Sequence, residues 1–512
     1  MTEALGKESA GDVRTVARGG AVQIAGQLTQ RGLDFVFYAV LTNALGLAAF
    51  GLYRQIVSAL VLGAQVGLGG FNYAAVRFIA RARATREWGM VRGTARASLA
   101  GSLAVSGVVV TAIIFFADPL ADVFARGDAD QERFADLLRI GAAYVPCFAV
   151  MQVFRYCTQA YKTMLPSVIA GNIVFPVALF MLGIGAVAAG LAVEGAVWAL
   201  VISTAVGAIT AAWLYWRLLG DEELAARPVI RFGEIVRFAV PQAGSSLLSF
   251  QGLGYGLLII GALSSNLDAG IFGVALALQG PGTIFLSGVV NIWAPVVTDL
   301  YEKHEIDRLR SIYQTLTRWV ATFSFPVWAV LIIEPELFAA IFDASKAEEA
   351  APVIAILAIG NIFYTGTGPA GYVISMTGHP GFNLVNSIVA VGAYIGLGLL
   401  VVPDHGVIGM AVVDASVTAA SNVSRVIAAR YYVGIQPYGH SFLKPVVATL
   451  AGSVVLIAWG LLFGDAIWVE IAGIVVAAGV YLWALKLLGI DPEEREVLDS
   501  IRKRVLRRKL DR

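Results

Sequence analysis

An apolar stretch near the N-terminus carries polar and charged side chains at helical spacing. Within QIAGQLTQRGLDFVFYAV (residues 23–40), Gln27, Arg31 and Asp34 recur at intervals of four and three residues, which places them on one face of a helix. A forked guanidinium binds phosphate oxygens, and a carboxylate beside it can restrain it or serve a coupling ion. The stripe therefore predicts a site for an anionic headgroup or for a coupling ion. The alternative is an Arg31–Asp34 pair that only fixes helix packing.

Other apolar segments carry similar polar stripes. Single polar residues in a membrane-spanning helix commonly make helix–helix contacts worth about 0.6 kcal/mol each, whereas stripes on several helices indicate a hydrated central cavity. The other side chains predicted to line this cavity are Arg54, Gln65, Asn72, Arg155, Gln279 and Asn291. Because its arginines outnumber its aspartate, the cavity should be cationic, which suits an anion and repels a cationic drug.

These stripes lie on long apolar segments. Of the 512 residues, 58% are hydrophobic and only 14% are charged, whereas soluble proteins have about 25% charged residues. The apolar residues form runs of roughly 20 residues, the length of a membrane-spanning helix. The sequence therefore predicts an all-α polytopic membrane protein with about fourteen transmembrane helices.

The connections between the apolar segments are segregated by charge. The connection at 77–96 (RFIARARATREWGMVRGTAR) and the C-terminal IRKRVLRRK are basic, whereas DPLADVFARGDADQE and EPELFAAIFDASKAEE belong to connections of the opposite side and are more acidic. Because basic connections remain in the cytosol, both termini are predicted to be cytosolic in a protein of the cytoplasmic (inner) membrane. The basic tail is expected to lie on anionic lipid rather than on nucleic acid.

The two halves of the chain resemble each other. LTNALGLAAFG (41–51) pairs with LSSNLDAGIFG (263–273) at an offset of 222, and Asn172 pairs with Asn386 at an offset of 214. Since the partners are six spans apart, the halves are predicted to be parallel repeats that enclose a transporter cavity. The predicted divisions are a cytosolic tail (1–18), an N-terminal six-helix bundle (19–218), a cytosolic linker (219–231), a C-terminal six-helix bundle (232–432), two additional helices (433–488) and a basic cytosolic tail (489–512).

Prolines and glycines interrupt several of the apolar segments. We expect the bundles to rock about the linker, with Pro241, Pro281, Pro295 and the glycines of GTGPAG (366–371) as bending points. GTGPAG also fits a nucleotide-binding pattern, but it lies inside an apolar segment with no strand before it. The sequence has no Walker A motif, no metal-ligand spacing and no catalytic constellation. We therefore expect no enzymatic activity and no cofactor, with H⁺ or Na⁺ coupling left open.

Several of these features occur together in one known family. With its repeat, its FGLY and IFGV segments after short outer loops, and its GHPGFNLVN…HGVIGMAVV run, the chain resembles polysaccharide flippases of the Wzx type. These O-antigen and exopolysaccharide flippases share a superfamily with the MATE multidrug exporters. The resemblance implies translocation of a polyprenyl-diphosphate-linked oligosaccharide from the inner to the outer leaflet by alternating access, for cell-surface polysaccharide biosynthesis. The implied partners are membrane lipids, a polysaccharide polymerase and chain-length machinery.

Under this interpretation the charged stripe has specific roles. Arg31 would hold the diphosphate, and Asp34 would restrain or release it. Arg155 toward the inner end, Arg31 near the middle and Arg54 toward the outer part of their spans would form a ladder of cationic stations.

Three alternatives stay open. A MATE-type cation-coupled multidrug antiporter would use Asp34 as its ion site. A lipid II flippase would also carry arginine and aspartate in its first span. A membrane-embedded glycosyltransferase or polymerase would need acidic catalytic residues or a large outer loop, and the sequence predicts only short outer loops.

Overall fold

The computed structural model describes residues 2–125, 128–248, 250–464 and 466–489, without the side chains of residues 2–21 and of a few other positions. Within that part of the chain every regular element is a helix. The reason is that apolar runs of this length must satisfy their backbone hydrogen bonds internally once they lie in a membrane. The predicted all-α fold is therefore confirmed.

The first half of the chain begins with one very long helix. α1 (Thr2–Leu45) has 44 residues and extends about 66 Å, well beyond the thickness of a bilayer core, about 30 Å. The elements that follow it are α2 (Leu47–Leu68), α3 (Phe71–Ala84), α4 (Trp88–Phe115), α5 (Ala117–Phe124), α6 (Asp128–Gly141), α7 (Tyr144–Gln159), α8 (Leu165–Val168), the π-helical turn η1 (Ile169–Val174), α9 (Phe175–Ala188) and α10 (Ala192–Leu218).

The second half repeats the order of elements of the first. α4 has 28 residues and is followed by the short α5, and α17, also with 28 residues, is followed by the short α18. The elements of this half are α12 (Phe232–Ser246), α13 (Phe250–Leu253), α14 (Tyr255–Leu263), α15 (Asn266–Leu278), α16 (Gly280–Glu302), α17 (Ile306–Ile333), α18 (Pro335–Asp343), η2 (Ala344–Lys346), α19 (Ala347–Gly366), α20 (Ala370–Met376) and α21 (Pro380–Val433). The linker contains α11 (Asp221–Ala225), and η3 (His440–Phe442), α22 (Leu443–Phe463) and α23 (Ile467–Leu487) follow the repeat.

α21 folds back on itself at Gly406. The φ angle of this glycine is 53°, in the left-handed region that glycine adopts without strain. The Tyr394 hydroxyl donates to Asp414 Oδ2 at 3.0 Å, and Asn386 Nδ2 donates to Ser421 Oγ at 2.9 Å. Contacts between positions that converge on the turn show that the two arms run antiparallel.

The antiparallel arms matter for the number of membrane crossings. Ten helical segments of the described chain, or eleven with the bent pair α15–α16, are long and apolar enough to span a membrane. α21 is one of these segments although it has two arms, and α1 and α12–α14 are outside the count because of polar residues and breaks. With these included, the path agrees with the roughly fourteen crossings expected from the apolar runs.

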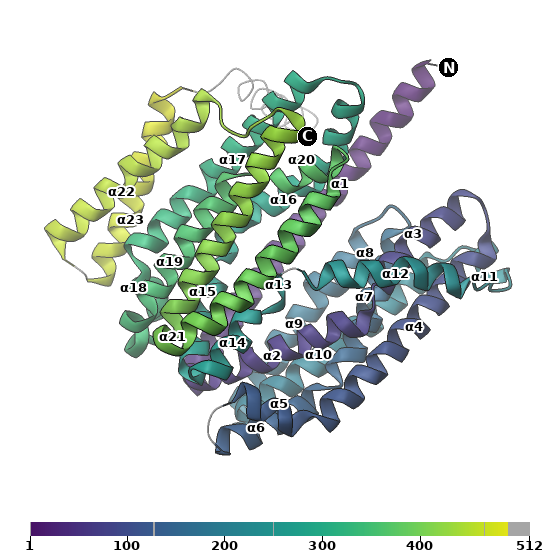
Figure 1. Ribbon diagram of the computed structural model, residues 1–512, viewed down its shortest axis with the longest axis horizontal. Coiled ribbons are helices and arrows are strands. Elements are labelled where there is room, and N and C mark those ends of the chain that lie inside the picture. Colours follow the sequence, from purple (N-terminus) through teal and green to yellow (C-terminus); the bar gives the residue numbers. More distant parts are fainter. Residues whose placement is uncertain (1, 126–127, 249, 465, 490–512) are drawn as a thin grey trace, which may run out of the picture.

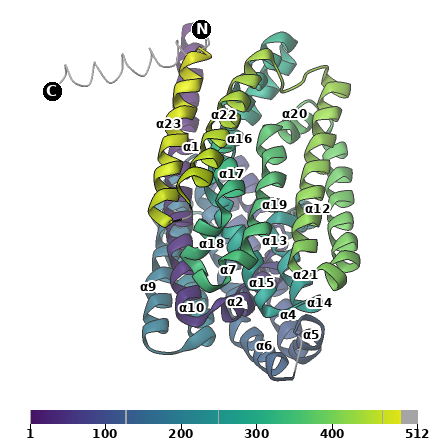
Figure 2. The same ribbon diagram turned by 90° about the vertical axis from the view of Figure 1, so that its left-hand side faces the viewer.

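The helices form two bundles that meet at one end and diverge toward the other (Figure 1). α22 and α23 pack beside α17 on the outside of the C-terminal bundle (Figures 1 and 2). At the joined end α2 crosses α15, and Gln55 Nε2 donates to Asn266 Oδ1 at 2.8 Å. A Cβ on Gly51 would lie 1.8 Å from the Asn266 carbonyl oxygen, and a Cβ on Gly270 would lie 2.1 Å from the Leu47 carbonyl oxygen. The close crossing therefore requires glycine at both positions.

The two ends of the molecule differ in their connections. The short connections after α1 and α14, predicted to be outside, lie at the joined end, whereas the basic turn between α3 and α4 lies where the bundles diverge (Figure 1). The bundles thus diverge toward the side that the basic connections predict to be cytosolic.

α12 packs against the N-terminal bundle. Its contacts with α3 and α4 are made by a buried cluster of Phe71, Ala74, Phe78, Ala97, Ile235 and Ala239. The Arg77 guanidinium on α3 also lies 4.3 Å from the centre of the Phe238 ring. The sequence repeat groups residues 232–246 with the C-terminal bundle, but their packing surface belongs to the other bundle.

The linker is fastened to the same bundle. Glu223, 3% exposed, accepts hydrogen bonds from Arg83 Nε at 3.0 Å and from the Tyr161 hydroxyl at 2.8 Å. Burial raises the pKa of the Tyr161 hydroxyl, which therefore remains protonated as the donor. The Val229 amide donates to the Gly89 carbonyl oxygen at 2.9 Å. We therefore expect the pivot between the bundles beyond the linker, at the breaks between α12, α13 and α14, rather than within it.

The predicted kink at GTGPAG is confirmed. α19 ends at Gly366 and α20 begins at Ala370, and Gly368 between them has a φ angle of 59°. The Tyr313 hydroxyl donates to the Thr367 carbonyl oxygen at 3.0 Å, which satisfies one backbone acceptor freed by the break.

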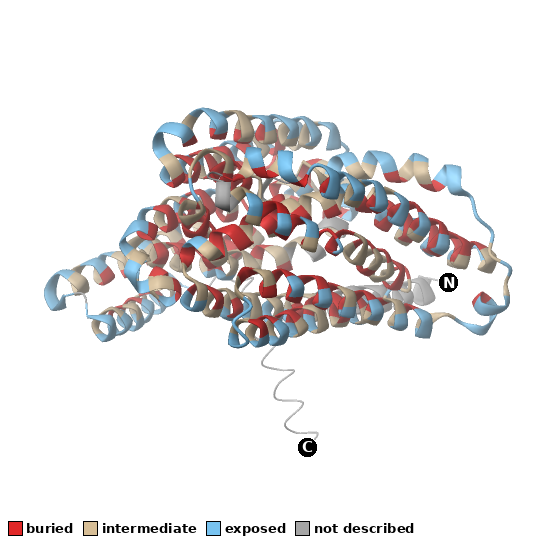
Figure 3. Ribbon diagram, turned by 90° about the horizontal axis from the view of Figure 1, so that it is seen from below, coloured by how far each residue is buried: buried red, intermediate tan, exposed pale blue. Residues whose placement is uncertain are grey.

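Buried residues follow the faces where helices meet, and exposed residues cover the outside of the bundles (Figure 3). Several exposed residues are large and apolar, among them Phe115 at 80% and Leu461 at 83% exposure. An apolar outer surface of this kind is stable in lipid, where burial against water does not drive packing.

Candidate functional site

Charged side chains of α1 and α2 line a cavity between the bundles. The cavity has a volume of about 810 Å³ and is bounded by α1, α2, α15, α16 and α19. Its polar lining consists of Arg31, Asp34, Tyr38, Arg54, Gln279, Thr283, Ser287, Asn361 and Tyr364. We call it the Arg31 cavity.

Arg31 reaches from α1 to the opposite bundle. Its Nη1 donates to the Gly280 carbonyl oxygen at 2.5 Å and to Thr283 Oγ1 at 2.7 Å, both on α16. Among the described residues no ion pair joins Arg31 to Asp34, because the guanidinium extends to these oxygens instead. Nε and Nη2 of Arg31 make no hydrogen bond to a described residue and remain available to a ligand in the cavity.

Arg54 is held in the same cavity by Tyr38. Its Nη1 donates to the Tyr38 hydroxyl at 2.9 Å, and its guanidinium carbon lies 4.9 Å from the ring centre, a cation–π contact. Asp34 lines the same cavity and interacts electrostatically with both Arg54 and Arg31. The carboxylate therefore offsets part of the positive charge of the cavity without neutralising it.

The predicted amides are placed differently. Gln279 lines the Arg31 cavity, whereas Gln27 and Gln65 are half-buried and do not line it. Asn72 is 3% exposed within α3, and the side chain of Asn291 lies outside the described residues. The structure thus brings together the predicted charged residues of α1 and α2 and separates them from the amides further along α2 and α3.

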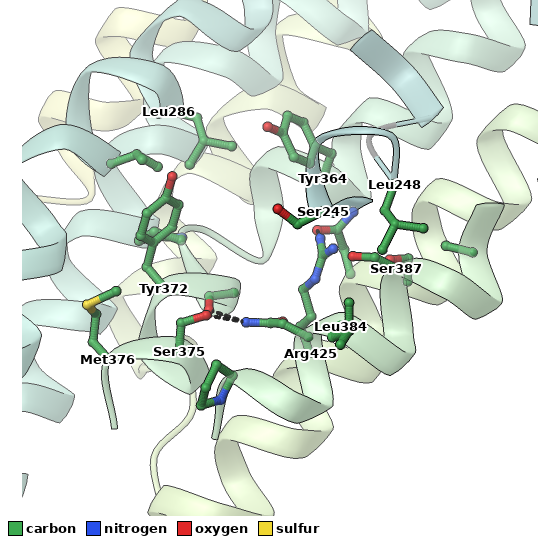
Figure 4. Close-up of a pocket in the computed structure, with 18 of the residues that line it drawn as sticks. Ser245, Leu248, Leu286, Tyr364, Tyr372, Ser375, Met376, Leu384, Ser387 and Arg425 are labelled. Carbon is green, nitrogen blue, oxygen red and sulfur yellow. Dashed lines mark hydrogen bonds between the residues drawn. The ribbon is translucent and has the colours of Figure 1, made fainter. Parts of the chain in front are cut away.

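A second cavity lies beside the first. It has a volume of about 960 Å³ and lies among α12, α16, α20 and α21 (Figure 4). Its polar lining consists of Tyr73, Gln242, Ser245, Tyr364, Tyr372, Ser375, Asn383, Ser387, Ser421, Asn422 and Arg425. Tyr364 lines both cavities, so the two are neighbours. We call the second one the Arg425 cavity.

Arg425 is the cationic residue that sequence reasoning missed. It lies on the second arm of α21, where Asp414, Thr418, Ser421 and Arg425 recur at intervals of four, three and four residues. This is the helical spacing that identifies the stripe on α1. The signal for a polar stripe on this arm is therefore present in the sequence.

Arg155 lines neither cavity and is part of the packing of the N-terminal bundle. Its Nε donates to the Ser167 carbonyl oxygen at 3.1 Å, its Nη1 to Gln152 Oε1 at 3.3 Å and its Nη2 to Asn172 Oδ1 at 3.1 Å. A Cβ on Gly171 would lie 2.1 Å from the guanidinium carbon of Arg155, so η1 packs directly against the arginine. All three nitrogens have protein partners, and the predicted ladder lacks this member.

The cavity-lining arginines lie at different depths. Counted along its helix from the joined end, Arg54 lies about 10 Å, Arg31 about 21 Å and Arg425 about 27 Å into the molecule. The charged groups of the two cavities are these arginines and Asp34. Among the described residues, no group of three or more His, Cys, Asp or Glu could hold a metal ion. The arrangement suits an anionic ligand that is bound by forked donors.

Comparison with known proteins gives the family and the fold. A family model for polysaccharide biosynthesis proteins matches residues 16–300, and a search of curated proteins finds no match. The lipid II flippase MurJ in its inward closed conformation superposes with a TM-score of 0.72 at 11% identity, over 91% of this chain and 98% of that chain.

Two conformations of a MATE family transporter of the MOP superfamily are also similar. The inward-facing one gives a TM-score of 0.68 at 16% identity, over 81% of this chain and 98% of that chain. The outward-facing one gives 0.59 at 16% identity, over 83% and 96%. Because the family model covers more than half of the chain, this protein belongs to the polysaccharide biosynthesis protein family, and it has the fold of the MATE and MurJ transporters.

Proposed function

We propose that the protein moves a polyprenyl-diphosphate-linked oligosaccharide from the inner to the outer leaflet of the cytoplasmic membrane, for cell-surface polysaccharide biosynthesis. The observation that supports this most strongly is the Arg31 cavity, where Arg31 and Arg54 face a single carboxylate, Asp34. One guanidinium group can donate two parallel hydrogen bonds to the oxygens of a phosphate. A cavity with excess positive charge repels the cations that a multidrug antiporter would carry.

Arg31 would couple diphosphate binding to the movement of the bundles. In the structure it links α1 to Gly280 and Thr283 on α16. A phosphate oxygen is a stronger acceptor for a guanidinium than a neutral carbonyl or hydroxyl oxygen. An arriving diphosphate would therefore compete for Arg31 and weaken the contact between α1 and the C-terminal bundle, which favours rearrangement toward the outward-open state.

The remaining parts of the proposal concern orientation, coupling and partners. The basic connections support an inner-membrane protein with both termini in the cytosol. No cofactor is needed, and H⁺ or Na⁺ coupling would act at Asp34, the carboxylate that lines the Arg31 cavity. The product in the outer leaflet would be used by a polysaccharide polymerase and chain-length machinery.

A flipping assay in liposomes tests the proposal. Defined polyprenyl-diphosphate oligosaccharides are placed in one leaflet, with and without H⁺ or Na⁺ gradients, and their arrival in the other leaflet is measured with a lectin. We expect Arg31→Gln to abolish flipping and Arg31→Lys, which keeps the charge without the fork, to retain partial activity. Arg308→Gln is the matched control, because Arg308 lies in the exposed first turn of α17, outside the cavities, where it pairs with Glu305.

Two further substrates separate the alternatives. Lipid II and an organic cation are offered in the same liposomes. Transport of the organic cation without transport of the diphosphate sugar would show a multidrug antiporter, and transport of lipid II alone would show a lipid II flippase. Either result would contradict the proposed substrate class.

A further inference from the structure

We propose that the Arg425 cavity binds the glycan part of the substrate and recognises an acidic group on it, a carboxylate carried by one of its sugars. The inference rests on the proposed function, because it assumes that the diphosphate occupies the neighbouring Arg31 cavity. It adds that the translocated glycan is acidic and that Arg425 selects for this property.

The lining of the Arg425 cavity suits a carbohydrate. Amide and hydroxyl side chains from three elements surround it, among them Gln242, Ser245, Asn383, Ser387 and Asn422. Such groups both donate and accept hydrogen bonds, as sugar hydroxyls do. Tyr73 and Tyr372 add flat apolar surface with a polar tip, which can cover the apolar face of a sugar ring. The volume of about 960 Å³ is that of a site for a sizeable ligand.

Arg425 is the charged residue in this lining. Its Nη1 donates to Asn422 Oδ1 at 3.2 Å, and Nε and Nη2 make no hydrogen bond to a described residue. No aspartate or glutamate is among the described residues that line the cavity. Figure 4 shows the side chain extending toward Ser245 and Tyr364, across the middle of the cavity.

An arginine without an acidic partner is costly inside a membrane protein. Intramembrane charges are normally paired or face water, and they mark sites of function. Arg155 shows how this chain holds an arginine for packing alone, because each of its nitrogens has a protein acceptor. Arg425 lacks two of these acceptors, so an anion from the substrate would complete its hydrogen bonding.

The surroundings of Arg425 are fixed in place. Asn383 Nδ2 donates to the Gly371 carbonyl oxygen at 2.6 Å and to Ser375 Oγ at 2.7 Å, which ties α21 to the start of α20. A Cβ on Gly371 would lie 3.5 Å from Arg425 Cδ, so α20 passes close beside the arginine. The side of the cavity that carries the guanidinium is therefore held in place by contacts between α20 and α21, as a specific site requires.

The repeat indicates that Arg425 is not needed for the shared architecture. At the offset of 214 that pairs Asn172 with Asn386, the counterpart of Arg425 is Ala211 on α10. Ala211 is 1% exposed, so the same position in the N-terminal bundle is packed without a charge. The arginine is thus particular to the half that forms the second cavity.

The anion on Arg425 is assigned to the glycan rather than to the diphosphate because of its position. The diphosphate has Arg31 and Arg54 in one cavity, and Tyr364 lies where that cavity meets the Arg425 cavity. A group bound beyond Tyr364 belongs to what is attached to the diphosphate. Sugars carry negative charge most simply as carboxylates, which accept a guanidinium in the same forked manner.

The test compares two lipid-linked substrates that differ in one group. Both are polyprenyl-diphosphate oligosaccharides of the same length, one with a uronic acid and one with the corresponding neutral hexose. We expect the wild-type protein to transport the acidic substrate with a kcat/KM roughly tenfold higher, the size of one charge-assisted contact. Arg425→Gln should abolish this preference, so that the ratio of the two kcat/KM values falls to about one, because the acidic substrate loses its charge-assisted contact. Arg425→Lys should retain part of the preference.

Other outcomes overturn the inference and leave the proposed function distinguishable. If Arg425→Gln reduces the transport of both substrates equally, Arg425 binds the diphosphate or stabilises the fold. The wild type could instead transport both substrates equally well, with the transport of both abolished in Arg31→Gln. This result would refute the acidic subsite and support the flippase. If the wild type flips neither substrate, the proposed function itself fails.

Discussion

Arg155 in the N-terminal bundle lies among protein acceptors, whereas Arg425 in the C-terminal bundle lines a cavity. Arg155 donates hydrogen bonds to Ser167, Gln152 and Asn172, near η1. The linker is held on the same bundle by the hydrogen bonds of Glu223 to Arg83 and Tyr161. In the other bundle the α19–α20 span is broken at Gly368, and the Arg425 cavity lies beside the break. The first bundle is thus tied together by polar contacts, and the second uses a broken helix to expose polar groups.

This difference shows how an intramembrane arginine can be interpreted. A charge in an apolar helix indicates either a packing contact or a site, and its sequence position does not decide between them. The number of guanidinium nitrogens with protein acceptors does decide. By this criterion Arg155 is structural, and Arg31 and Arg425 keep donors for a ligand.

The largest effect on stability is expected for Arg155. Arg155→Gln removes the guanidinium and leaves Asn172 Oδ1 and the Ser167 carbonyl oxygen short of a donor. We expect the free energy of unfolding to fall by about 2–4 kcal/mol, seen as a lower melting temperature in detergent. Arg425→Gln is the matched control and should leave the melting temperature nearly unchanged. Equal destabilisation by both variants would break the distinction between the bundles.

The contact between the bundles at the joined end gives the next largest effect. Gly51→Ala places a Cβ 1.8 Å from the Asn266 carbonyl oxygen, and overpacking of this kind costs about 1–3 kcal/mol. Because the strain exists only while α2 and α15 are in contact, we expect a shift toward the state in which this end opens. Spin labels at Ala84 and Glu302, near the cytosolic ends predicted for α3 and α16, should move closer together.

Gly107→Ala is the control for this experiment, since a Cβ on Gly107 meets no atom within 4 Å. An unchanged label distance in Gly51→Ala, with the control also unchanged, would show that α2 and α15 part without altering the open end. The two bundles would then not move as rigid units.

Much of the fold could be predicted from the sequence, because apolar length and charge in the connections act locally. The repeat also followed from local segments, and the kink at GTGPAG followed from a proline and glycines. The packing of α12 on the N-terminal bundle could not be predicted, since it depends on which apolar faces meet in space. The turn at Gly406 could be predicted, by contrast, because the connection PDHG (403–406) interrupts the apolar run and ends in a glycine, which adopts the φ of 53° without strain.

The site was predicted in part for a related reason. Spacing identifies which side chains share a helix face, and Arg31 and Asp34 of one such face line a cavity together with Arg54 of α2. Spacing does not give the direction of that face, so Arg155 was expected in the cavity and Arg425 was overlooked. Nor does it show that a long side chain prefers a distant acceptor, as Arg31 does with Gly280.

A smaller effect on stability is expected where Glu223 holds the linker on the N-terminal bundle. Glu223→Gln keeps the shape of the side chain but weakens its bonds to Arg83 and Tyr161. We expect the free energy of unfolding to fall by about 1–2 kcal/mol and limited proteolysis within residues 219–231 to become faster. Glu305→Gln, at an exposed i,i+3 pair with Arg308, should change neither quantity. Slow proteolysis in both variants would show that other contacts hold the linker.

The smallest effect concerns the oxygens that hold Arg31 in the structure. Thr283→Val removes one acceptor of Arg31 Nη1 and leaves the Gly280 carbonyl oxygen in place. If Thr283 competes with the diphosphate for the guanidinium, its loss frees the arginine, and KM for the lipid-linked sugar should fall about two- to threefold, the effect of a weak neutral hydrogen bond. If Thr283 instead binds the substrate directly, KM should rise by a similar factor. Thr111→Val, on an exposed face of α4 where the hydroxyl donates to the Gly107 carbonyl oxygen at 2.8 Å, controls for the loss of a hydroxyl alone. The sign of the change in KM therefore decides whether the contact between α1 and α16 is a latch that the substrate releases or a part of the binding surface itself.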